Sequence, residues 1–167
     1  PVGGCNITFD GYYSGAGVTI NYRGNKTTQL LGNNGDIRIN CIGDDSCRYT
    51  VINADWASNI YLLCLNEPDY SYYEICYGIE LHAAHAQNVH LDFDGYLAVS
   101  NGDVWLNNAS TVTMAALGQS SFYLSNLYAE YAESVILSLI DHSSYAGYQS
   151  TFYIPGPNTI INCYGKG

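Results

Sequence analysis

Basic residues are scarce in this chain. Five Lys or Arg stand against 15 Asp or Glu among 167 residues, for a formal net charge of −10. The phosphates of nucleic acids and the headgroups of anionic membranes would repel such a surface, so we expect neither as a partner. No apolar run is long enough to span a membrane, and we expect no membrane insertion. Only 12% of the residues are charged, so Asn, Ser, Thr and Tyr must supply much of the surface polarity.

The chain also lacks features of an unprocessed start and of a metal or redox motif, which bears on its processing and on its cellular compartment. The chain has neither an initiator Met nor an apolar leader, which suggests that Pro1 begins a processed chain or a repeat within a longer one. It has no CxxC spacing, although zinc sites or catalytic thiols would be the alternatives to test in a cytosolic protein. Six Cys favour an oxidising compartment, so we expect an extracellular protein, either secreted or at the cell surface. The length fits a single domain, residues 1–167.

The sequence does contain a repeat of about two dozen residues, in which three apolar positions alternate with other residues. The repeats are Val18-x-Ile20-x-Tyr22, Ile37-x-Ile39-x-Cys41, Ile60-x-Leu62-x-Cys64, Val89-x-Leu91-x-Phe93, Val112-x-Met114-x-Ala116, Val135-x-Leu137-x-Leu139 and Thr159-x-Ile161-x-Cys163. Their starts are 19, 23, 29, 23, 23 and 24 residues apart. Period-2 alternation inside such a repeat is typical of a coiled sheet. We therefore predict an all-β fold, a parallel β-helix (solenoid) of about seven coils of roughly 23 residues.

The repeat continues when the last residue is joined to the first. The step from Thr159 through Gly167 to Val18 of another copy is 26 residues, and no capping segment is apparent at either end. An open coil presents unpaired strand edges that recruit other strands. We therefore expect uncapped ends in register with a following copy, and a homopolymer built head to tail. The alternative, that both termini belong to incomplete coils of an excised solenoid, stays open.

Very small residues mark one corner of the predicted coil. Three residues before each repeat start there is a Gly or Ala in every case except Asn34. These residues are Gly15, Asn34, Ala57, Ala86, Ala109, Ala132 and Gly156. A tight corner, where successive coils pass close together, leaves no room for a longer side chain.

The cysteines follow the same repeat. Cys47, Cys76 and Cys5 each lie thirteen residues before the next start, and a second Cys occurs only in coils with Cys in the third apolar position. This pattern predicts the disulfides Cys41–Cys47 and Cys64–Cys76, and an inter-subunit disulfide from Cys163 to Cys5 of the following copy. Pairing between stacked coils, Cys41 with Cys64 and Cys47 with Cys76, also falls within disulfide reach and stays open.

Candidate modification and contact sites lie outside the apolar positions. Three N-glycosylation sequons begin at Asn6, Asn25 and Asn108, where about two are expected by chance, and N-linked glycans are a predicted addition. Three Tyr crowd the longest loop and are candidate ligand contacts, namely Tyr70, Tyr72 and Tyr73. The commoner role of such rings is to stack in ladders that stabilise the outside of a coil.

The sequence predicts no enzyme, no cofactor and no metal site. His90, Asp92 and Asp94 form an outward row that could bind a cation, but a solvated polar face is the commoner explanation. Asp44 and Asp45 could coordinate calcium, but a turn rich in Gly and Asp is commoner. Hydrolysis of a polysaccharide would need two carboxylates about 5 to 9 Å apart in a cleft, and the short loops provide no cleft.

One segment also carries a family resemblance. Ile39-Asn-Cys41-Ile-Gly43-Asp-Asp-Ser46-Cys47, with Ile161-Asn-Cys163-Tyr-Gly165, resembles the I-x-C-x-G-x-x-S/A-C repeat of secreted coiled-sheet proteins of algae and other protists. The resemblance covers the three Cys-bearing coils and implies a secreted β-solenoid, in a group that includes filament-forming structural members. We therefore expect a structural subunit of an extracellular fibre. The alternative is an extracellular, adhesin-like module that binds a carbohydrate or a protein.

Overall fold

The fold is known from a computed structural model, which describes residues 5–10, 17–21, 35–43, 45–65, 74–141 and 149–165. These residues form strands and turns, and they include no helix that could cross a membrane. The strands are β1 (Cys5–Asp10), β2 (Thr19–Asn21), β3 (Asp36–Ile42), β4 (Val51–Asn53), β5 (Asn59–Leu65), β6 (Cys76–Tyr77), β7 (Glu80–His82), β8 (Asn88–Asp94), β9 (Val99–Ser100), β10 (Asp103–Trp105), β11 (Thr111–Leu117), β12 (Phe122–Tyr123), β13 (Asn126–Tyr128), β14 (Ser134–Asp141), β15 (Thr151–Tyr153) and β16 (Thr159–Gly165).

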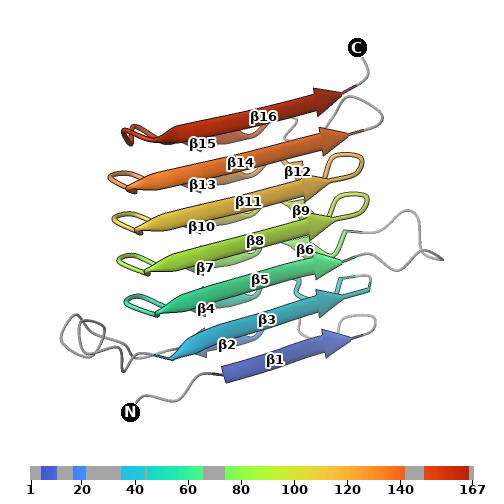
Figure 1. Ribbon diagram of the computed structural model, residues 1–167. Helices are drawn as coiled ribbons and strands as arrows, with labels where there is room; N and C mark the ends of the chain where they lie inside the picture. Colours follow the sequence, from blue (N-terminus) through green and yellow to red (C-terminus); the bar gives the residue numbers. More distant parts are fainter. Residues whose placement is uncertain are drawn as a thin grey trace.

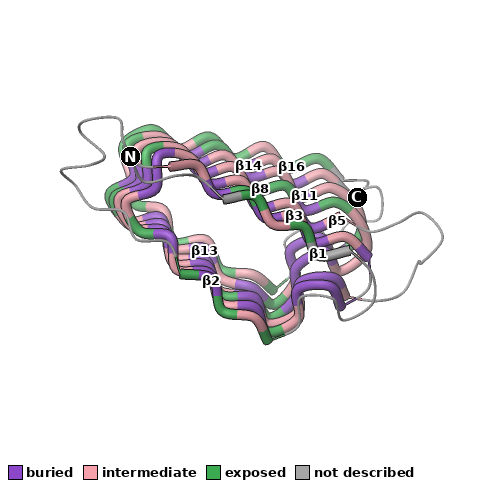
Figure 2. The backbone as a smooth tube through the Cα atoms, turned by 90° about the horizontal axis from the view of Figure 1, so that it is seen from below, coloured by how far each residue is buried: buried purple, intermediate pink, exposed green. Residues whose placement is uncertain are grey.

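The strands build three parallel sheets that wind into a β-solenoid. The main sheet has seven strands in the order β1-β3-β5-β8-β11-β14-β16, the second sheet has six in the order β15-β13-β10-β7-β4-β2, and the third has three in the order β12-β9-β6. Figure 1 shows the coils stacked from the N-terminal to the C-terminal end, and Figure 2 shows them superimposed when seen from below. The predicted all-β parallel solenoid is confirmed over about five turns, and the total of seven coils stays a prediction.

The register of the main sheet agrees with the predicted stacking for six of the seven repeats. Their starting residues lie opposite one another from strand to strand, in the order Ile37, Ile60, Val89, Val112, Val135 and Thr159. From β3 to β14 the three apolar positions of each strand point inward and are buried. The alternating apolar residues of the sequence are therefore the residues that face the core, because successive residues of a strand face opposite sides of the sheet.

The first predicted repeat is placed wrongly. Ile20 lies opposite Ile52 in the second sheet, and β1 takes the first place in the main sheet, where Ile7 lies opposite Ile39. The predicted step from Val18 to the next repeat is therefore wrong, and so is the step that joined the end of one copy to Val18 of another.

The error has a physical cause. Period-2 alternation marks any strand with one buried face, and it does not say to which of two sheets the strand belongs. The sequence separation between the two sheets does identify the sheet. In four coils, the first core position of the main-sheet strand and the core position of the second-sheet strand are fifteen residues apart. These pairs are Cys5–Ile20, Ile37–Ile52, Val89–Val104 and Val112–Leu127. The first coil is therefore regular when it begins at β1.

The predicted tight corner is present. Ala57, Ala86, Ala109 and Ala132 are buried, and in each case the residue before the Ala has positive φ. A Cβ added to Gly156 would lie 2.5 Å from the carbonyl oxygen of Ala132. The backbones of successive coils thus approach too closely at this corner for a larger side chain. Gly15 and Asn34 lie outside the described residues.

Candidate functional site

The C-terminal end of the solenoid exposes part of its core. Ile161 of β16 lies opposite Leu137 of β14, in the inward column that also contains Met114. Leu137 is 0% exposed and Met114 is 2% exposed, whereas Ile161 is 52% exposed. Burying a side chain of this size contributes about 1.5 to 3 kcal/mol. A core position at the end of the stack therefore lacks the coverage that its equivalents have one coil below.

The N-terminal end presents the complementary edges. Among the described residues, β1 pairs with β3 alone and β2 pairs with β4 alone, as Figure 1 shows. Ile7 of β1 and Val18, directly before β2, are partly buried and pack against the core. At the other end β16 and β15 also have a neighbour on one side only. Among the described strands, each end thus has two parallel edges without a further neighbour, and such edges can pair with strands of another chain.

Both ends are poor in charge. Residues 149–165, which form the last described coil, contain no Asp, Glu, Lys or Arg. At the other end, residues 5–10 and 17–21 contain Asp10 alone, and the remaining 14 of the 15 acidic residues lie between positions 36 and 141. Residues 36–141 therefore hold 14 acidic residues against two Arg, and the described residues of the two ends contain a single charged residue between them.

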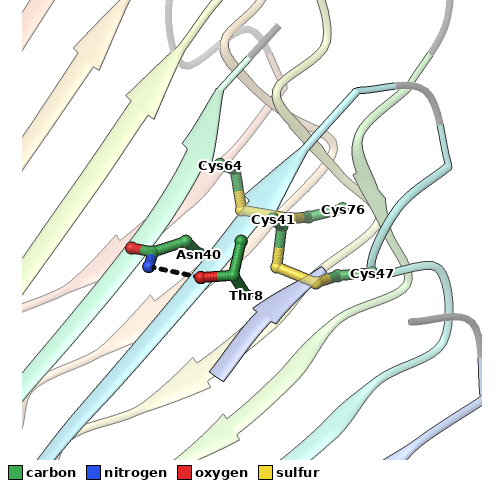
Figure 3. The surroundings of a disulfide bond; sticks show 6 residues. All are labelled: Thr8, Asn40, Cys41, Cys47, Cys64 and Cys76. Atoms are coloured by element: carbon green, nitrogen blue, oxygen red, sulfur yellow. Dashed lines mark hydrogen bonds between the residues drawn. A yellow bond between two sulfur atoms is a disulfide. The ribbon is translucent and has the colours of Figure 1, made fainter. Parts of the chain in front are cut away.

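Two disulfides lie within coils near the N-terminal end. Cys41 pairs with Cys47 and Cys64 pairs with Cys76, with Cα–Cα distances of 5.7 and 6.4 Å. The two predicted intra-coil pairs are confirmed, and the pairing between coils is not formed. Figure 3 shows the two disulfides in adjacent coils.

The stacking of these disulfides also explains a cluster of sulfur atoms. The Sγ atoms of Cys41, Cys47 and Cys76 lie within 4.8 Å of one another, the spacing of a metal-binding group. All three belong to disulfides, and metal binding requires thiolates. The cluster is thus a consequence of packing one disulfide on the next.

The two remaining cysteines do not occupy equivalent places. Cys163 is a free, exposed residue of β16, and its register continues the column of Cys41 and Cys64. Cys5 lies opposite Ile37, at the start of β1. The predicted equivalence of Cys5 with Cys47 and Cys76 is therefore wrong. The disulfide from Cys163 to Cys5 of another copy stays a prediction, without the spacing argument on which it was based.

The other predicted sites lie on the outside or beyond the described residues. Asn6 and Asn108 are exposed, as a glycosylation site requires, and Asn25 lies outside the described residues. The candidate contact residues Tyr70, Tyr72 and Tyr73 also lie outside them.

The polar residues of β8 face outward, as predicted. Asp92 and Asp94 are exposed, and the three inward residues between and before them are buried. The Nδ1 atom of His90 lies 2.6 Å from the Thr113 hydroxyl, and its ring stacks on Tyr61 at 4.9 Å. His90 is thus held by its neighbours in the adjacent coils and belongs to the wall of the solenoid.

Aromatic ladders on the outer wall were not predicted at these positions. His82 stacks on Trp105 at 4.4 Å, and Trp105 is parallel to Tyr128 at 6.0 Å. At the next corner Trp56 stacks on His85 at 4.1 Å. Each ring thus covers one face of its neighbour in the adjacent coil. The ladders stabilise contacts between coils, the role that the sequence favours for Tyr.

A polar cluster at the edge of the third sheet was also missed. The Arg48 guanidinium lies 2.9 Å from Asp45 Oδ1 and 4.7 Å from the ring centroid of Tyr77. The Ser100 hydroxyl donates a hydrogen bond to Glu74 Oε1 at 3.1 Å. Burial raises the pKa of Glu74, and the Ser100 hydrogen bond opposes this effect. Asp45, a candidate calcium ligand in the sequence, is thus paired with an arginine, and Asp44 lies outside the described residues.

Comparisons of this chain with protein-family models, with curated proteins and with solved structures find no match.

Proposed function

We propose that this chain is the structural subunit of an extracellular fibre and that it polymerises head to tail by continuing its solenoid across each junction. The exposure of Ile161 at the end of a core column that is buried from Ile39 to Leu137 carries this proposal. Both ends present parallel strand edges, and the described residues of both ends contain Asp10 as their single charged residue. A contact between two different ends does not close on itself, so repetition produces a filament.

The same features support the finer parts of the proposal. Seven strands in the main sheet are consistent with seven coils in each copy. Two disulfides favour an oxidising, extracellular compartment. Asn6 and Asn108 are exposed and available to N-linked glycans, which would make the fibre a glycoprotein polymer. No catalytic step, cofactor or metal enters this proposal.

The test is a substitution at the exposed core position. Ile161→Asp places a charge where a second copy would bury an apolar side chain, and we expect it to abolish assembly while the monomer stays folded. The matched control is Ile136→Asp, the same change on the outward face of β14, one coil below the terminal strand β16. Electron microscopy and sedimentation velocity measure assembly, and circular dichroism measures folding.

Two results would count against the proposal. If Ile161→Asp assembles as the unsubstituted chain does, the exposed core is not the junction. If the unsubstituted chain stays monomeric at all concentrations, the fibre proposal fails. An adhesin-like module that binds a carbohydrate or a protein would then be the better proposal.

A further inference from the structure

We propose that the four disulfide cysteines can exchange their bonds, from pairing within coils to pairing between coils. These residues, Cys41, Cys47, Cys64 and Cys76, are the cysteine box. The bonds within coils are Cys41–Cys47 and Cys64–Cys76. The bonds between coils are Cys41–Cys64 and Cys47–Cys76. A thiol catalyst is enough for this change, so the box can respond to thiols in its surroundings. The exchange does not depend on the proposed fibre.

The first pair between coils fits the register of the main sheet. Cys41 of β3 lies opposite Cys64 of β5. Neighbouring strands are about 4.8 Å apart, which is inside the Cα–Cα range of a disulfide, about 4.4 to 6.8 Å. Both side chains point into the core and are buried. A bond between them therefore needs no shift of either strand.

The second pair is aligned by backbone hydrogen bonds. Cys76 lies opposite Val99, and its N–H donates to the carbonyl of Ala98, one residue before Val99. The N–H of Cys47 donates in the same way to the carbonyl of Ile75, one residue before Cys76. The same hydrogen-bond pattern in a parallel ladder implies the same register, so Cys47 lies opposite Cys76. Both pairs between coils thus join residues that are direct neighbours in adjacent coils.

The sulfur atoms are close enough for exchange. The Sγ atom of Cys76 lies within 4.8 Å of both sulfurs of the Cys41–Cys47 bond. Among the described residues, Cys64 is the one disulfide cysteine outside this group. Exchange proceeds by attack of a thiolate on one sulfur of a disulfide. A thiolate at Cys76 therefore needs only a small movement to reach the neighbouring bond.

The exchange conserves electrons and uses a monothiol as catalyst. The monothiol attacks Cys64 as its thiolate, which breaks Cys64–Cys76, forms a mixed disulfide at Cys64 and releases the Cys76 thiolate. That thiolate attacks Cys47, forms Cys47–Cys76 and releases the Cys41 thiolate. Cys41 then attacks the mixed disulfide, forms Cys41–Cys64 and returns the monothiol. Two disulfides are present at the start and at the end, so nothing is oxidised or reduced overall.

The exchange alters what the bonds hold together. The present bonds close loops inside single coils, with sequence separations of 6 and 12 residues. The bonds between coils span 23 residues from Cys41 to Cys64 and 29 from Cys47 to Cys76, and they tie the coil of β3 to the coil of β5. Bonds that close longer loops restrict the unfolded chain more. All four cysteines are 0% exposed, so a monothiol reaches them through local opening of these coils.

The first test uses a box-only chain, in which Cys5→Ser and Cys163→Ser leave the cysteine box as the full set of cysteines. The folded chain is incubated with 2-mercaptoethanol until the starting bonds begin to react, then quenched with acid and mapped without reductant. Four cysteines allow three pairings. We expect the two bonds between coils to appear together, and the diagonal bond Cys41–Cys76 to be at least about ten times rarer. The same chain unfolded in guanidinium is the control and should give all three pairings.

Two outcomes of this test would overturn the proposal. One is loss of the starting bonds to reduced cysteines without either bond between coils. The other is a diagonal bond as frequent in the folded chain as in the unfolded control, which would show scrambling by unfolding.

A second test needs no added thiol. In the box-only chain, Cys64→Ala leaves the Cys76 thiol beside the Cys41–Cys47 bond, and we expect a Cys47–Cys76 bond to form. The matched variant Cys76→Ala leaves the Cys64 thiol instead and should exchange at least about ten times more slowly. Peptide mapping after acid quenching measures both rates, and circular dichroism checks the fold. Equal rates in the two folded variants, or no bond to Cys76 in the first, would refute the exchange.

Discussion

The Asn40 side chain donates a hydrogen bond from Nδ2 to Thr8 Oγ1 at 3.1 Å and ties β3 to β1 (Figure 3). A second bond, from Asn53 Nδ2 to Asn21 Oδ1 at 2.9 Å, joins the same two coils in the second sheet. The first coil is thus held by matching side-chain contacts in both sheets. This arrangement places β1, and not the segment at Val18, at the edge of the main sheet.

The position of β1 can be tested by cross-linking within one chain. Asn6 and Arg38 lie opposite each other on the outward face, so Asn6→Cys with Arg38→Cys is expected to form an intramolecular disulfide. Thr19→Cys with Arg38→Cys is the control, because a main-sheet strand starting at Val18 would instead pair Thr19 with Arg38. Non-reducing peptide mapping in a Cys163→Ser background distinguishes them. Efficient formation of the control disulfide would place the Val18 segment in the main sheet.

The close approach at Gly156 predicts a steric penalty. A Cβ there would meet the Ala132 carbonyl oxygen at 2.5 Å, so Gly156→Ala must shift the backbone of the last coil. We expect the free energy of unfolding to fall by about 1 to 3 kcal/mol, the usual cost of overpacking. Pro155→Ala, at the exposed neighbouring residue, is the control and should cost less than about 1 kcal/mol. Denaturant unfolding measures both, and equal losses would refute the steric explanation.

The two disulfides should differ slightly in their effect on stability. Their sequence separations are 6 and 12 residues. Loop-closure entropy then predicts losses of about 2 kcal/mol for Cys41→Ala with Cys47→Ala and about 3 kcal/mol for Cys64→Ala with Cys76→Ala. Cys163→Ala is the control, since this residue is free and exposed, and should change stability by less than about 0.5 kcal/mol. Guanidinium unfolding without reductant gives the values, and a larger loss for the control would contradict the assignment.

Glu74 should make stability depend on pH. Burial raises its pKa above the ordinary value of 4.5, so the folded state binds this proton more tightly than the unfolded state does. The free energy of unfolding contributed by Glu74 therefore falls as pH rises above 4.5, and the ionised carboxylate is unfavourable at pH 7. Glu74→Gln keeps an acceptor for Ser100 and is expected to stabilise the protein at pH 7 and not below pH 4.

The exposed residue Glu133 provides a matched control for Glu74. Glu133→Gln removes the same charge from the surface and should not reproduce the pH-dependent gain. Urea unfolding at several pH values separates the two variants. A gain for Glu74→Gln that is the same at pH 4 and pH 7 would show that the carboxylate charge is not its cause.

The sequence predicts most of the main sheet, because inward residues there are long, apolar and regularly spaced. The starts from Ile37 to Thr159 stack as predicted, and the small side chain of Ala57 and its equivalents locates a corner. The prediction of the first coil is wrong because the alternation in Val18-x-Ile20 fits a strand of either sheet. The fifteen-residue offset to the second sheet, which is found in four coils and links Ile37 to Ile52, is the signal that would have corrected it.

The outer wall is less predictable from sequence. The stacked pair Trp56 and His85 occupies the position directly before the small-residue column, so its repeat could have been recognised. Arg48 and Asp45 lie three residues apart in one turn, but Glu74 comes from the next coil and no regular spacing relates it to them, so the whole cluster could not have been recognised. Side-chain partners across coils depend on loop lengths, which the repeat alone does not determine.

The axial repeat of the assembled chain tests the central claim most directly. If copies continue the solenoid, seven main-sheet strands spaced by about 4.8 Å give a repeat of about 34 Å per subunit. Electron microscopy of filaments, with their averaged power spectra, measures this repeat together with the strand spacing. We expect unbranched filaments with both spacings along the axis. A chain that stays monomeric at high concentration, or filaments whose strands run along the axis, would contradict it.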